Sequence, residues 1–96
     1  MNNEEIKLLI QSLGAQILGS HYESMGAVAV LFSETIKFRD QLKNDTGVVL
    51  TVADTRAALD ALERYMDTRQ FPSGLTSEQL ALSQLYLDRL TLFKRG

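Results

Sequence analysis

His21 is the only histidine in the 96-residue sequence, and it is the side chain best suited to proton transfer or metal binding near neutral pH. A nucleophilic site needs a base held by a third group, and a metal site needs several ligands at suitable spacing. The neighbours Ser20 and Glu23 instead fit the S-x-x-E capping box, in which both side chains satisfy backbone N–H groups at a helix start. We therefore interpret these residues as a helix start and expect no metal ion.

A second group with catalytic potential is Asp45, Thr46 and Gly47, which form a D-T-G triplet. In these three residues the chain resembles the aspartic proteases, whose retroviral-type members are dimers of chains of similar length. That family places its aspartate after an apolar strand, whereas Asp45 follows residues 41–44, which have the pattern of a helix end. The glycine-rich flap and the strand-rich pattern of these proteases are also missing. We interpret the triplet as turn residues and expect no enzymatic activity, no cofactor and no small-molecule substrate.

The composition is typical of a small globular domain, with 45% apolar residues, a net charge of −2 and no cysteine. Without cysteine there is neither a disulfide framework nor a thiolate nucleophile. The longest apolar run, residues 25–32, is far shorter than the roughly 20 residues that cross a bilayer. No basic segment precedes a hydrophobic one at the N-terminus. We expect a single domain over residues 1–96, located in the cytoplasm and without membrane contact.

Four segments have helical periodicity, and together they predict an all-α, four-helix bundle-like fold. Their bounds are about 3–18, 21–43, 52–69 and 77–94. Besides the box at residues 20–23, the start signals are an asparagine cap at Asn2 or Asn3, the Thr51/Asp54 pair, and the T-x-x-Q capping box of residues 76–79.

Between the second and third helices, residues 48–51 are rich in branched side chains but too short for a strand without a partner. We predict an extended connector that packs on the core. A two-stranded ribbon formed across a dimer is the alternative.

The helices at 21–43 and 77–94 are more apolar than the outer helices of a small bundle. In the first of them two apolar stripes lie side by side, which predicts a helix between two layers of protein. In the second, apolar side chains cover most of the circumference. This surface is either enclosed by loops of the same chain or buried against another chain, and we favour the interface. The expected contact residues are Leu82, Leu85, Leu92 and Phe93.

These features make a non-enzymatic, helical protein–protein interaction module our leading functional hypothesis. Such a module presents an apolar helix face to a second copy of the chain, most simply in a dimer, or to another protein. It would act as an adaptor, inhibitor or assembly factor, and small proteins of this composition are frequent among phage and mobile-element accessory genes.

The alternative hypothesis is a nucleic-acid-associated regulator. In this case a dimer brings together the C-terminal cations Arg89, Lys94 and Arg95. The net charge is −1 for each of residues 1–19, 20–45 and 46–75, and +1 for residues 76–96, so no segment is strongly basic. Cations near a helix C-terminus are also expected from the helix dipole. Nucleic acid is therefore the less favoured partner.

Overall fold

A computed structural model of the chain describes residues 2–14, 16 and 24–90. The elements are α1 (Asn3–Leu9), the π-helical turn η1 (Ile10–Gly14), α3 (Ser24–Thr46), α4 (Val52–Thr68) and α5 (Ser77–Leu90). No strand occurs among the described residues. The structure therefore confirms the predicted all-α fold with its four helical segments.

The predicted start signals for three of the helices are present as complete capping boxes. Asn2 and Glu5 exchange side chain–backbone hydrogen bonds at the start of α1. Thr51 and Asp54 do so before α4. At the start of α5, the Gln79 N–H donates to Thr76 Oγ1 and the Thr76 N–H donates to Gln79 Oε1. The box proposed for Ser20 and Glu23, together with His21, lies outside the described residues.

The helix ends differ from the predicted bounds in two places. The helix predicted to end at residue 43 continues to Thr46, so Asp45 and Thr46 lie in its last turn and Gly47, with a φ of 75°, follows it. The threonine hydroxyl donates to the Leu42 carbonyl at 2.7 Å, so this polar group is satisfied within the last turn of the helix. The second difference lies within the predicted helix 3–18, where the α-helix ends at Leu9 and the π-helical turn η1 follows. The predicted limits at residues 18, 21 and 94 fall outside the described residues.

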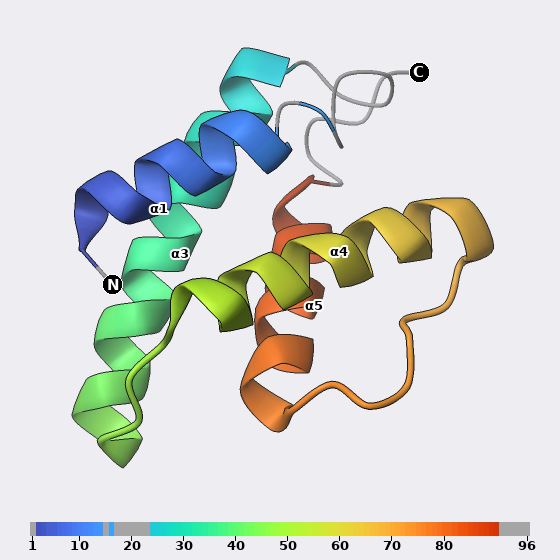
Figure 1. Cartoon of the computed structure of the whole chain (residues 1–96). Helices are drawn as coiled ribbons and strands as arrows, with labels where there is room; N and C mark the ends of the chain where they lie inside the picture. Colours follow the sequence, from blue (N-terminus) through green and yellow to red (C-terminus); the bar gives the residue numbers. More distant parts are fainter. Residues whose placement is uncertain (1, 15, 17–23, 91–96) are drawn as a thin grey trace.

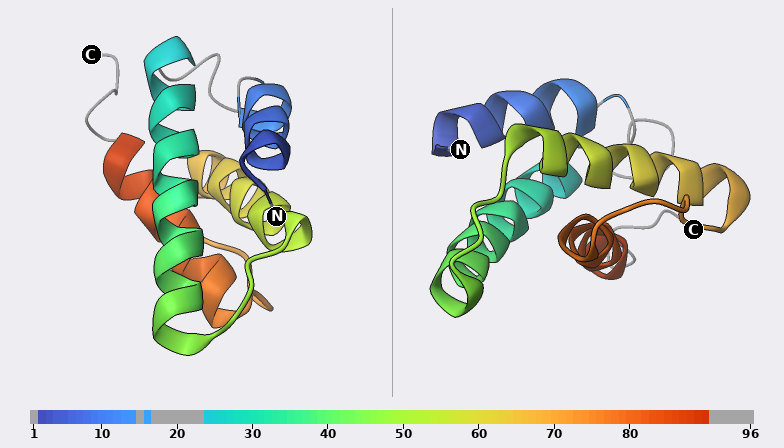
Figure 2. Two further views of the ribbon diagram at one scale, coloured as in Figure 1. Left: turned by 90° about the vertical axis from the view of Figure 1, so that its left-hand side faces the viewer. Right: turned by 60° about the horizontal axis from the view of Figure 1, so that its bottom comes forward.

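The helices form a closed ring in the order α1, α3, α5, α4, in which each helix packs against its two neighbours. Figure 1 shows α4 crossing α5, with α3 beside them and α1 lying over α3. In the right panel of Figure 2, α5 is seen nearly end-on, with α3 and α4 on neighbouring sides of it. The ring encloses one core, to which every helix contributes: Ile6, Leu9, Ile10, Ala27, Leu31, Leu50, Ala58, Leu59, Leu62, Leu82, Tyr86 and Leu90.

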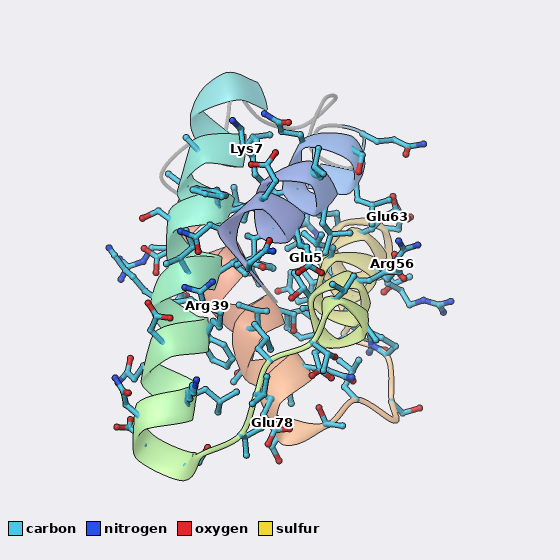
Figure 3. All side chains as sticks on the ribbon, turned by 60° about the vertical axis from the view of Figure 1, so that its left-hand side comes forward. Glu5, Lys7, Arg39, Arg56, Glu63 and Glu78 are labelled. Carbon is cyan, nitrogen blue, oxygen red and sulfur yellow. The ribbon has the colours of Figure 1, made fainter. Side chains whose placement is uncertain are left out.

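Helix α3 packs against α5 and against α1 with its π-helical turn η1. A buried row of Ala27, Leu31 and Thr35 runs along the middle of the helix. On one flank Glu34 reaches α5, and on the other flank Arg39 donates to the Asn3 side chain at 2.7 Å. Figure 3 shows Arg39 on the side of α3 that faces α1.

Candidate interaction surfaces

The face of α5 expected to bind a partner is only partly available. Leu82 has no exposed surface and belongs to the core, so the expectation that it points outward is wrong. The physical reason is that the buried row of α5 follows the spacing of Leu82, Tyr86 and Leu90, one helical turn apart. Leu85 is half-buried against the core and keeps some exposed surface. The other two predicted contacts, Leu92 and Phe93, lie outside the described residues.

The buried row of α5 includes a polar contact that the apolar pattern concealed. Tyr86 is fully buried, and its hydroxyl pairs with Thr35 Oγ1 of α3. Thr35 Oγ1 also donates to the Leu31 carbonyl at 2.7 Å. Because a threonine hydroxyl has one proton, Tyr86 must donate to Thr35. Burial raises the pKa of the Tyr86 phenol, more than the hydrogen bond with Thr35 lowers it, so this group stays neutral in the folded protein.

The capping boxes of α4 and α5 are joined to each other. Gln79 Nε2 donates to Asp54 Oδ1 at 2.9 Å, while the other carboxylate oxygen, Oδ2, accepts the Thr51 N–H at 3.1 Å. Burial raises the pKa of Asp54, but hydrogen bonds with Gln79 and Thr51 outweigh it, and the net pKa is lowered. A single carboxylate therefore caps the start of α4 and also binds the side chain that caps the start of α5.

Among the cations proposed for nucleic-acid binding, Arg89 forms an ion pair within the chain. Arg89 Nε lies 3.5 Å from Glu34 Oε1 on α3, and the Arg89 side chain is 52% exposed. The same carboxylate oxygen lies 3.9 Å from Lys37 Nζ, three residues further along α3, so Glu34 has two cationic neighbours. Lys94 and Arg95 fall outside the described residues.

Other charged side chains of the fold face outward. On α4, Arg56 and Glu63 lie on the side of the helix away from α3 (Figure 3), and both are exposed.

The large apolar side chains that the described fold leaves most exposed lie away from the predicted face. They are Val48 and Val49 of the connector, with 39% and 57% of their surface exposed, and Leu8 of α1, with 59% exposed. The extended connector at 48–51 is confirmed, but only Leu50 packs on the core. Val48, Val49 and Thr51 are exposed on either side of this single buried residue.

Within the described part of the chain, buried side-chain nitrogen and oxygen atoms all have hydrogen-bond partners. No cluster of potential metal ligands occurs among residues 2–14, 16 and 24–90. The described helices include none with both the length and the apolar character needed to cross a bilayer. The hydroxyls of the buried polar residues Thr35, Thr55 and Ser83 each donate to a carbonyl three or four residues earlier in the chain, and Thr35 also pairs with Tyr86.

Comparison with known proteins gives no relative: no protein-family model, no curated protein and no solved structure matches this chain.

Proposed function

We propose that this chain is a non-enzymatic protein–protein interaction module that acts as an adaptor, inhibitor or assembly factor. The observation that carries the proposal is the exposed pair Val48 and Val49. Two adjacent branched apolar side chains are held outward on an extended connector between α3 and α4. Removal of exposed apolar side chains from water favours association, and extended segments pair readily with other chains.

Two further surfaces support the proposal. Leu85 leaves part of the α5 face accessible, and the sequence continues beyond the described residues with the apolar Leu92 and Phe93. Leu8 adds a large apolar side chain on α1. The partner is a second copy of the chain or another protein, and in either case association buries these side chains.

The test compares Val49→Asp with a matched control, Gln41→Asp, which places the same charge at an exposed position of α3. Both variants are expected to keep the helical circular dichroism of the parent protein, since neither side chain is part of the core. Light scattering over a dilution series measures self-association, and affinity capture from the source cells measures binding of other proteins.

We expect Val49→Asp to lose the dimer or the captured partner, while Gln41→Asp retains it. A parent protein that is monomeric at all concentrations and captures no protein sensitive to Val49→Asp would contradict the proposal.

The alternative of a nucleic-acid-associated regulator has no comparable support among the described residues. The cation expected to contribute from α5, Arg89, is paired with Glu34. We therefore give protein–protein interaction as the proposed function.

A further inference from the structure

The contact between Asp54 and Gln79 joins two helix starts that are far apart in the sequence. Each of the two residues already belongs to a capping box, with Thr51 and Thr76 respectively. The Gln79 side chain uses both ends of its amide: Oε1 accepts the Thr76 N–H at 3.1 Å, and Nε2 donates to Asp54 Oδ1 at 2.9 Å. Asp54 likewise uses both carboxylate oxygens, one for its own cap and one for Gln79.

Because the side chains of Asp54 and Gln79 each hold two partners, the loss of one cap frees a group on which the other depends. A Gln79 amide that rotates away from Thr76 also leaves Asp54. An Asp54 side chain that rotates away from Thr51 also leaves Gln79. Hydrogen-bonded networks of this kind show energetic coupling beyond pairwise bonds.

We propose that Asp54 and Gln79 form a clip that makes the first turns of α4 and α5 open and close as one unit. The clip is a conformational device of the fold. Opening releases the two segments that lead into these helices, residues 47–51 and 69–76, together. This inference does not depend on the proposed function, because it concerns the coupling of two helix starts within one chain.

The structure suggests an exchange of the two functional groups as the test. Gln79→Glu keeps the oxygen that caps the Thr76 N–H but removes the donor to Asp54 and places two carboxylates together. Asp54→Asn keeps the oxygen that caps the Thr51 N–H but places an amide against the Gln79 amide. In the double variant, the amide introduced at position 54 can donate to the carboxylate introduced at position 79, so the clip is rebuilt with its polarity reversed and with the original total charge.

The measurement is hydrogen exchange at the four cap amides, those of Thr51, Asp54, Thr76 and Gln79, followed by NMR on the full chain. Each single variant is expected to accelerate exchange at both helix starts about tenfold, the effect of losing a hydrogen bond to a charged group. The double variant is expected to regain most of the protection. A matched control is Glu78→Gln, which changes the charge one residue away, at the start of α5 (Figure 3), and leaves the clip intact.

A second substitution tests transmission directly. Thr51→Ala removes a cap of α4 only, and the clip predicts at least about twofold faster exchange at the Thr76 and Gln79 amides as well. In the Gln79→Glu background this transmitted effect should vanish. Effects of Thr51→Ala confined to α4, or a double variant no better protected than the product of its single effects, would overturn the proposal. The exchange of groups also decides the matter if a single variant is poorly folded, since only a real clip lets the double variant recover.

Discussion

The buried hydroxyl pair of Tyr86 and Thr35 predicts an unusual order of stabilities among three variants. Tyr86 donates to Thr35 Oγ1, and Thr35 in turn donates to the Leu31 carbonyl at 2.7 Å. Tyr86→Phe removes the first donor and leaves the second bond intact. The expected loss is about 1 kcal/mol, the net contribution of one hydrogen bond.

Thr35→Val has a different consequence, although it is nearly isosteric. The variant leaves the Tyr86 O–H as a donor without an acceptor at a position with 0% exposure. An unsatisfied buried polar group costs about 1–3 kcal/mol, so Thr35→Val should destabilise the protein more than Tyr86→Phe does. In the double variant both sites are apolar, and the loss should fall to about 0–1 kcal/mol, below that of Thr35→Val alone.

Urea unfolding followed by circular dichroism measures all four proteins under one condition. Equal m-values would show that the four proteins expose the same surface on unfolding, so that their free energies of unfolding can be compared directly. The reasoning is refuted if Tyr86→Phe is the more damaging single change, or if the double variant loses as much stability as the two single variants added together.

Four further predictions follow from single groups. The pKa of Tyr86 is raised in the folded protein, so the phenol loses its proton at a lower pH in the unfolded chain. The free energy of unfolding should therefore fall as the pH rises above about 10. Urea unfolding at alkaline pH should show a weaker pH dependence for Tyr86→Phe. The pKa of Asp54 is lowered in the folded protein, so the ionised carboxylate contributes its full stabilisation above the ordinary pKa of an aspartate. This stabilisation is lost as the pH falls through the pKa of the folded state. In thermal unfolding, the difference in stability between the parent and Asp54→Asn should shrink below about pH 4. Gly47 and Arg69 both have positive φ, of 75° and 64°, a conformation that glycine adopts more easily than other residues. Gly47→Ala should therefore lower the free energy of unfolding by about 1 kcal/mol, and Arg69→Gly should raise it by up to about 1 kcal/mol. Changes of the same sign in urea unfolding would contradict this prediction. A Cβ atom at Gly14 would lie 3.3 Å from Ile10 Cγ2 and 3.6 Å from Leu31 Cδ1, so a larger side chain has little room there. Gly14→Leu should destabilise the protein by about 1–3 kcal/mol in the same assay. An unchanged stability would show that η1 can move away from α3.

Local sequence patterns predicted most of the helix starts and the fold class. The boxes at Thr51 and Thr76 could be identified because each depends on residues within one turn. The link between them could not, since it joins side chains that only the packing of α4 on α5 brings together. The same limit applies to Glu34, whose partner Lys37 is local and whose partner Arg89 is distant.

The sequence did not indicate which face of α5 is buried. When apolar residues surround a helix, their positions do not indicate which side faces the core. The structure buries Leu82 with the polar residues Ser83 and Tyr86, and leaves Leu85 half-exposed. The Ser83 hydroxyl is satisfied by the Leu80 carbonyl within its own helix, and the Tyr86 hydroxyl is satisfied by α3. The apolar pattern therefore does not identify the buried face of α5, because that face includes polar residues.

The ring order of the helices has a consequence for the sequence of events in folding. Helices α4 and α5 are neighbours both in the ring and in the chain, so only the short segment 69–76 must be closed to bring them together. The contact of α1 with α4 closes the ring over a much longer stretch of chain, and loop-closure entropy makes such contacts slower to form. We therefore expect α4 and α5 to form the folding nucleus and α1 to dock last. Substitutions of Leu59 should then slow refolding, whereas substitutions of Ile6 should mainly accelerate unfolding.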